Sequence, residues 1–126
     1  MRFAAILACL LSAASARAAT LSIYVDANSS DMIGQQVIYY LKQDIISSSQ
    51  FRIAYVPKQS DYEISMVTLE DSHTYNSELS TAYSAVFVRG TILYIDNLVG
   101  ICGSFNVKSC AASILASFGH DVDSLR

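Results

Sequence analysis

The sequence predicts a single α+β domain, a two-layer sandwich in which two helices cover one face of a mostly antiparallel sheet of about four to five strands. Three observations lead to this fold class. Several short segments alternate apolar and polar residues with a period of two, as half-buried strands do. Two longer segments, 31–48 and 107–118, carry apolar stripes at helical spacing. The elements follow the order strand, helix, several strands, helix, and two amphipathic helices need a common surface to cover.

The first strand and the first helix are well marked in the sequence. Alternation over 21–26 predicts the strand, and a polar turn follows it. The helix is expected to begin with Ser29 or Ser30 as its N-cap and with Asp31 near the positive end of the helix dipole. Gly34 lies at the edge of the apolar stripe, where it either allows a close approach to the sheet or is simply tolerated. The stripe itself consists of Ile33, Val37, Tyr40, Leu41 and Ile45.

The middle of the chain predicts further strands. Pro57 ends the first of them, because proline cannot donate a hydrogen bond to a ladder. Gly90 is expected to supply the positive φ of a hairpin turn between the last two. These strands are predicted at 51–56, 62–69, 81–88 and 91–95.

The second helix is expected to start after a cap at Ser104 or Asn106 and to end at Gly119, a typical helix-stopping residue. Residues 120–126 are then expected to form a frayed polar tail. The sheet face away from both helices is expected to be solvated and partly lined by tyrosines.

The first 18 residues have the pattern of a bacterial Sec-type signal peptide. A positive charge at Arg2 precedes an apolar run over 3–14, and small residues precede a cleavage site after Ala18. The apolar run is too short for a membrane span, which needs about 20 residues. Residues 19–126 would then form the mature domain, without a membrane span and located in the periplasm or secreted. The alternative, lipidation at Cys9, has only a loose lipobox to support it.

An even pair of cysteines remains after such cleavage. Cys102 and Cys110 lack the C-x-x-C spacing of redox motifs, and neither histidine stands at metal-ligand spacing from them. In an oxidising compartment the pair therefore predicts a disulfide.

Composition excludes two broad classes of protein. Hydrophobic residues make up 52% of the 126-residue chain and charged residues 15%, which is the opposite of a disordered chain. The net charge is −3 for the whole chain and becomes −5 without Arg2 and Arg17. An acidic domain lacks the basic face that nucleic-acid binding requires, so no nucleic-acid partner is expected.

No catalytic constellation is visible in the sequence. There is no G-x-S-x-G elbow, Ser-x-x-Lys pair or phosphate-binding glycine loop. Asp26 and Asp31 could hold a cation, although capping of the helix is the simpler role for the second. We therefore expect no enzymatic activity, no cofactor and no metal site. A cofactor-free hydrolase, with His73 as a lone base, is the least favoured hypothesis.

Tyrosine is unusually frequent, with eight residues and no tryptophan. Tyr24, Tyr39 and Tyr75 fall on polar faces or in a polar loop, where exposed tyrosines suit protein contacts. These three, together with His73, form the candidate interaction residues. The alternative is that β-rich domains carry tyrosines on half-buried strands in any case.

Three sequence segments resemble a group of small exported proteobacterial proteins that have no established activity. They are YVDAxSSDxxGQ from Tyr24, VTL from Val67, and VGxCG from Val99, which is followed by Cys110 and Ala111. The resemblance implies export and the disulfide, and it supplies no catalytic residues. The element order is also similar, at fold level, to the amino-terminal adaptor domain of the Tol-system propeller protein.

Taken together, the sequence favours a non-catalytic periplasmic or secreted domain that acts by contacts with an envelope or secreted protein, as an adaptor or an inhibitor. For an inhibitor, the polar loop 71–78 would be the inserting element. The alternative is a periplasmic protein that binds a small ligand or a cation on the concave side of its sheet. The sequence does not specify an oligomeric state.

Overall fold

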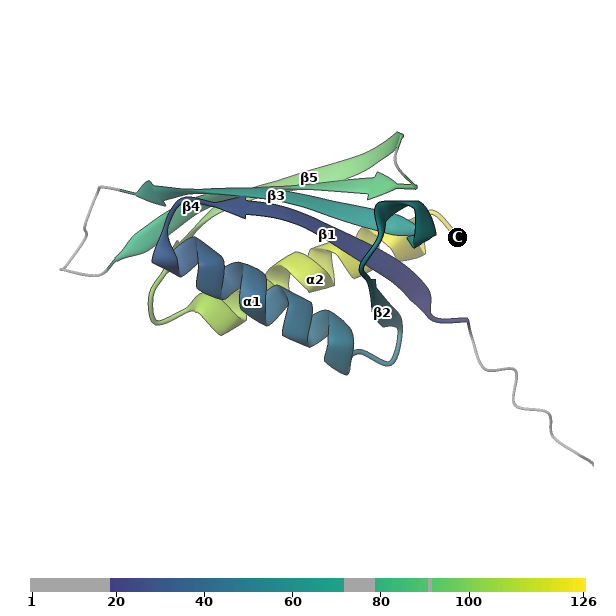
Figure 1. Cartoon of the computed structure of the whole chain (residues 1–126), viewed down its shortest axis with the longest axis horizontal. Coiled ribbons are helices and arrows are strands. Elements are labelled where there is room, and N and C mark those ends of the chain that lie inside the picture. The colour runs from purple at the N-terminus through teal and green to yellow at the C-terminus, as the bar shows by residue number, and fades with distance from the viewer. Residues whose placement is uncertain (1–18, 72–78, 91) are drawn as a thin grey trace, which may run out of the picture.

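The computed structural model describes residues 19–71, 79–90 and 92–126, and it shows two layers (Figure 1). A five-stranded sheet forms one layer, and both helices lie side by side against one of its faces. The predicted α+β sandwich is therefore confirmed. In chain order the elements are β1 (Leu21–Ser29), α1 (Met32–Ser47), β2 (Phe51–Ala54), the short 3₁₀ helix η1 (Pro57–Gln59), β3 (Tyr62–Asp71), β4 (Ser80–Arg89), β5 (Leu93–Gly103) and α2 (Val107–Ser124).

The sheet is mixed, which corrects the expectation of a mostly antiparallel one. Its strand order is β2-β1-β3-β4-β5, and β1 runs parallel to both of its neighbours. The pairs β3–β4 and β4–β5 are antiparallel. The reason lies in α1, which separates β1 from β2 in the chain. A helix between two adjacent strands carries the chain back to the starting edge, so the second strand enters in the same direction as the first.

The short connection from β2 to β3 is held against the start of β1. Because β2 has four residues, its end lies close to the level at which β3 begins. The Asp61 carboxylate accepts hydrogen bonds from the Ser22 backbone N–H at 2.7 Å and from the Ser22 hydroxyl at 2.8 Å. The Asp61 N–H in turn donates to the Ser22 hydroxyl oxygen at 2.9 Å. These bonds hold the pKa of Asp61 below its usual value, the backbone bond being the main cause.

The start of α1 is capped by Asp31, and not by Ser29 or Ser30 as the sequence suggested. Its side chain accepts a hydrogen bond from the Gly34 N–H at 2.7 Å. A second carboxylate oxygen accepts from the Thr81 hydroxyl of β4 at 2.8 Å. Asp31 is buried because the helix approaches the sheet closely here. A Cβ on Gly34 would overlap the hydroxyl of Thr68 on β3, so the glycine permits that approach, which was one of its two predicted roles.

The core lies between the sheet and the two helices, and Phe118 of α2 stands at its centre. Its ring meets Phe51, Tyr62 and Phe87 edge to face, with centroids 5.4 to 5.6 Å apart. These rings come from β2, β3 and β4, so a single helix residue joins three strands. The α1 stripe was predicted well: every buried apolar side chain of that helix belongs to it.

Three elements extend at least three residues beyond their predicted ends, and β1 does so to Ser29 instead of residue 26. β5 continues to Gly103, whereas a strand ending near residue 95 was expected. α2 does not stop at Gly119 but continues to Ser124, and Val122 is fully buried in the core. Residues 120–124 are therefore helix rather than a frayed tail, because Val122 anchors the last turn.

The strand predicted at 51–56 ends at Ala54, and Asn106 takes the N-cap position of α2 without a side-chain hydrogen bond. The turn at Gly90 and the disulfide are confirmed. Gly90 has a φ of 62° where the chain turns from β4 toward β5. Cys102 at the end of β5 is bonded to Cys110 in the first turns of α2, with Cα atoms 6.2 Å apart. Among the described residues, neither helix is long and apolar enough to cross a membrane.

Candidate functional site

The face of the sheet opposite the helices has no layer over it in the described parts of the chain (Figure 1). We call it the open face. Strand alternation sends every second residue to this face, and the ladder registers place these residues in rows across the sheet. The rows differ sharply in chemistry from one end of the sheet to the other.

One end of the open face is aliphatic. Val67 lies in one row with Val99, across Ser84, and Leu69 lies in the next row with Ile101, across Ala82. We call these four side chains, Val67, Leu69, Val99 and Ile101, the aliphatic patch. Their exposed fractions are 51%, 62%, 67% and 68%, respectively. Because Ser84 and Ala82 between them are small, the patch is shallow and consists of two aliphatic pairs on either side of β4.

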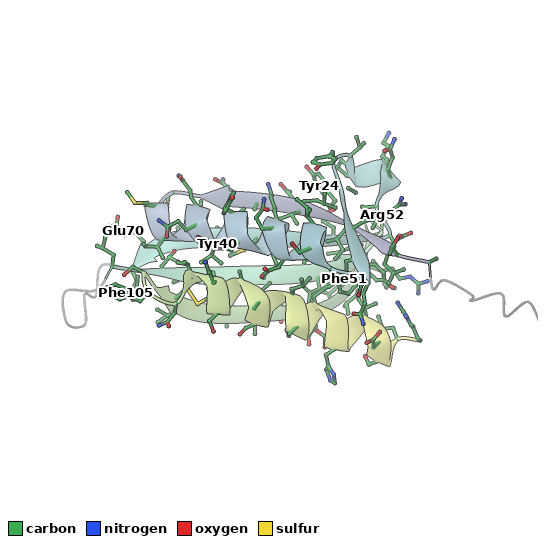
Figure 2. All side chains as sticks on the ribbon, turned by 90° about the horizontal axis from the view of Figure 1, so that it is seen from below. Tyr24, Tyr40, Phe51, Arg52, Glu70 and Phe105 are labelled. Atoms are coloured by element: carbon green, nitrogen blue, oxygen red, sulfur yellow. A yellow bond between two sulfur atoms is a disulfide. The ribbon has the colours of Figure 1, made fainter. Side chains whose placement is uncertain are left out.

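The same end of the molecule exposes further apolar side chains. Leu79 precedes β4, and Phe105 lies in the turn after β5; both are largely exposed. Figure 2 places Phe105 and Glu70 together at this end, away from Tyr24 and Arg52. Clusters of exposed apolar surface on soluble domains commonly mark interaction sites.

The opposite end of the open face is acidic and aromatic. Tyr24 pairs with Glu63 in the register, and Asp26 lies in the next row. Partial burial raises the pKa of Glu63, and the nearby Asp26 carboxylate raises it further. Tyr94 on β5 is exposed and donates a hydrogen bond to the Asn97 side chain at 2.9 Å.

The outer edge of β5 is a second candidate feature. β5 is the last strand of the sheet and pairs on one side with β4. Its Ser104 end is fixed by a hydrogen bond from the Ser104 N–H to the Leu79 carbonyl at 2.9 Å. In an antiparallel ladder, hydrogen-bonded and non-bonded pairs alternate. The residues whose N–H and C=O groups point away from β4 are therefore Asn97, Val99, Ile101 and Gly103, of which the Gly103 carbonyl already accepts the Asn106 N–H at 2.9 Å.

Gly100 lies in the middle of this edge, on the helix-side face of β5. A Cβ added there would come within 2.7 Å of the Tyr83 hydroxyl oxygen, so the Tyr83 side chain reaches across β5. Tyr83 is half-buried, and this burial raises the pKa of its hydroxyl. The hydroxyl makes no hydrogen bond to another side chain or backbone group within the described ranges.

Three hollows lined by described residues lie elsewhere on the surface. A groove of about 440 Å³ runs between the ends of α1 and α2 and is floored by Phe51 and Leu115. Two hollows of about 200 Å³ each flank β2. Lys42 and Arg52 line one of these each, and Tyr55 lines both. In the described ranges no three His, Cys, Asp or Glu side chains come close enough to hold a metal ion.

Of the predicted interaction residues the structure describes Tyr24 and Tyr39, and it does not bring these two together. Tyr24 lies half-buried on the open face, whereas Tyr39 is exposed on the outer side of α1, with its ring edge-on to Tyr40 at 5.3 Å. The two are on opposite sides of the molecule. His73 and Tyr75, and most of the loop 71–78, lie outside the described residues.

The aliphatic patch was missed at the sequence level, although a signal for it was present. In the middle of β3, both alternating sets of positions are apolar, Ile64 and Met66 on one face and Val67 and Leu69 on the other. Such a pattern is typical of a strand that is covered on both faces. The structure covers only one of them.

Comparison with known proteins identifies the fold but no family. No protein-family model matches the sequence, and no curated protein matches it. The chain is similar in structure to the PelC dodecamer from Paraburkholderia phytofirmans, with a TM-score of 0.55 and 12% identity over 78% of this chain and 86% of that one. It is also similar to protein XCC0632 from Xanthomonas campestris, with a TM-score of 0.51 and 7% identity over 83% of each chain.

Proposed function

We propose that this chain is an exported, non-catalytic protein that works in the bacterial cell envelope through contacts with other protein chains. The contacts are made by the aliphatic patch and the adjoining edge of β5. The leader pattern in the sequence and the Cys102–Cys110 disulfide support an extracytoplasmic location, because such bonds persist in oxidising compartments. An adaptor fits this surface better than an inhibitor, since the patch is shallow and broad.

The observation that carries the proposal is the aliphatic patch. Four aliphatic side chains, each more than half exposed, lie in two adjacent rows on one face. Full burial of an aliphatic side chain stabilises by about 1.5–3 kcal/mol, so a partner that covered them would gain substantially. Nothing in the folding of the domain itself requires these residues to be apolar, because small polar residues would fit the same solvated positions.

The titratable groups support a role without catalysis. The shifted pKa of Asp61 comes from its bonds to Ser22, which hold the β2–β3 connection in place. The shifted pKa of Glu63 comes from partial burial beside Asp26, with no histidine, lysine or nucleophile among the causes. Within the described ranges, both shifts are therefore accounted for without an acid–base partner.

The fold comparison gives indirect support. PelC, whose fold this chain shares, is described as a dodecamer, so this arrangement of strands and helices is used in at least one assembly of protein chains. A sequence identity of 12% supports only a shared fold. The proposal therefore rests on the exposed surface of this chain.

Site-specific photo-crosslinking in the producing cell tests the proposal. A photoreactive residue at position 101 probes the patch, and one at Gln43, exposed on the outer side of α1, is the matched control. We expect discrete protein adducts from position 101 and far fewer from position 43. Equal yields at both positions, or none at position 101, would contradict the proposal.

A second candidate function is the binding of a small anionic ligand beside β2. Lys42 and Arg52, with the tyrosine rings of Tyr24 and Tyr55, line the two hollows there in an otherwise acidic chain. Inorganic phosphate can serve as the probe: a ligand at 100 times its Kd adds about 2.7 kcal/mol to stability. An absence of any shift in Tm at high phosphate, for wild type and an Arg52→Ser variant alike, would remove this candidate.

A further inference from the structure

We propose that a second copy of this chain is a direct partner, bound by antiparallel pairing of the two β5 strands about a two-fold axis that passes beside Gly100. This inference rests on the proposed function, since it names one of the protein chains that the β5 edge contacts. The pairing would join two five-stranded sheets into one continuous sheet.

The free edge of β5 has the features of a pairing strand. It is 11 residues long, contains no proline, and carries a single charged residue, Asp96. Natural edge strands are usually shortened, charged or interrupted, because an open ladder pairs with other chains. β2, at the other edge, shows this protection: it has four residues and is followed at once by Pro57.

Hydrogen-bond geometry decides which residues of the two β5 strands can lie opposite each other. The outward-pointing groups of β5 belong to Asn97, Val99, Ile101 and Gly103, as derived above from the Ser104–Leu79 bond. An axis beside Gly100 places Val99 opposite Ile101 of the second copy, and Asn97 opposite its Gly103. Every outward-pointing residue then meets another one. Because the Gly103 carbonyl already accepts the Asn106 N–H at 2.9 Å, the pairing allows about six hydrogen bonds between the strands.

Several registers place outward-pointing residues opposite one another. Side-chain chemistry selects this one among them. Val99 and Ile101 lie on the open face, so each aliphatic side chain faces an aliphatic side chain of the second copy. The two patches merge into one surface across the axis. Asp96 falls opposite Ser104 of the second copy, which avoids the like-charge contact that an axis at Asp96 would create.

Tyr83 gives an independent indication on the helix-side face. Its hydroxyl lies over Gly100, next to the proposed axis, and makes no hydrogen bond within the described ranges. The hydroxyl can therefore donate to or accept from a group of a partner chain. In the proposed pair the two Tyr83 side chains flank the axis, where each hydroxyl gains polar groups of the second copy as neighbours.

Sedimentation of the exported protein provides the first test. Wild type is expected to show a concentration-dependent mass twice that of the chain. Val99→Pro removes an outward N–H without touching the β4 ladder, and Ile101→Lys places a charge opposite Val99; both are expected to be monomeric. Ile92→Lys, at an exposed apolar position outside the pairing region, is the control and stays dimeric. Thermal unfolding checks that each variant is folded.

Disulfide trapping tests the register. Directly opposed residues in an antiparallel pair lie about 5.5 Å apart at Cα, within reach of a disulfide, whereas diagonal ones are farther. A mixture of Val99→Cys and Ile101→Cys chains should therefore form the mixed dimer several-fold more than either variant links to itself. Equal yields of all three dimers would overturn the register.

The outcomes separate this inference from the proposed function. A monomeric wild type whose position 101 still crosslinks to a different envelope protein would overturn the second-copy inference and leave the proposed function intact. A monomeric wild type with no crosslinks at position 101 would overturn both.

Discussion

Both faces of the sheet carry large apolar residues, but they use them for opposite purposes. On the helix side, Ile23, Ile64 and Phe87 are fully buried. On the open face, Leu69 and Ile101 are mostly exposed, although they lie on the same or neighbouring strands. This difference shows that apolar residues in a strand do not by themselves reveal which face of the sheet is buried within the domain. A side chain buried within the domain stabilises it, whereas an exposed one is available to stabilise an assembly.

Phe118→Ala should have the largest effect on the covered face. The substitution removes the ring that meets Phe51, Tyr62 and Phe87, and it leaves a cavity between sheet and helices. We expect the free energy of unfolding to fall by about 3–5 kcal/mol, measured by urea denaturation. A loss below about 1 kcal/mol would show that Phe118 is not the centre of the core.

Loss of the disulfide should have the next largest effect. Replacing both Cys102 and Cys110 by alanine frees the loop between them, which lies at the boundary between β5 and α2. The chain-entropy relation gives a loss of about 2.5 kcal/mol for a loop of this length. Reductant should lower the stability of wild type by a similar amount and leave the double variant unchanged. A reductant effect on the variant would contradict this assignment.

Asp31→Ala tests the polar contact between the covered face and α1. The variant loses the cap on Gly34 and leaves the buried Thr81 hydroxyl without its carboxylate acceptor. We expect a loss of about 2 kcal/mol in unfolding free energy. Asp31→Asn keeps an acceptor oxygen and should lose less, as followed by thermal denaturation. Equal losses in the two variants would argue against the capping role.

The hydrogen bonds between Asp61 and Ser22 should make the unfolding free energy depend on pH. The pKa of Asp61 is lower in the folded chain than the value of about 3.9 for an unfolded aspartate. Its contribution to stability is therefore present above about pH 4 and is lost as the pH falls through the folded pKa. Asp61→Asn and Ser22→Ala should both reduce the acid dependence of the unfolding free energy. Unchanged acid profiles in both variants would contradict this role of the hydrogen bonds.

Substitutions in the aliphatic patch should affect folding least. Leu69→Ser and Ile101→Ser alter solvated positions, so the unfolding free energy of the isolated chain should change by no more than about 0.5–1 kcal/mol. The same variants should lose most of the crosslinking to partner proteins. A large loss of stability with normal crosslinking would reverse the roles assigned to the two faces.

Much of the fold could be predicted because local patterns encode it directly. The α1 stripe from Ile33 to Ile45, the turn at Gly90 and the Cys102–Cys110 bond all follow from spacing along the chain. Parallel pairing of β1 could not be derived in the same way, because it depends on where α1 returns the chain. The length of β5 was hidden by Asn97 and Gly100, residues that usually mark turns.

The candidate site was harder to predict than the fold. The sequence analysis named three tyrosines as candidate interaction residues. Two of them, Tyr24 and Tyr39, lie on opposite sides of the molecule. Nothing in the composition of the chain singles out the four aliphatic residues Val67, Leu69, Val99 and Ile101. They form a patch only because β3 and β5 flank the small residues of β4, a tertiary fact that no single segment contains.

The position of Phe118 also has a consequence for the order in which this protein can mature. The ring comes from the last helix of the chain, yet it unites β2, β3 and β4, which are synthesised earlier. A nascent chain that lacks α2 has no side chain to fill this space. The strands must therefore wait for the carboxyl-terminal segment, and folding is completed only after the whole chain has emerged.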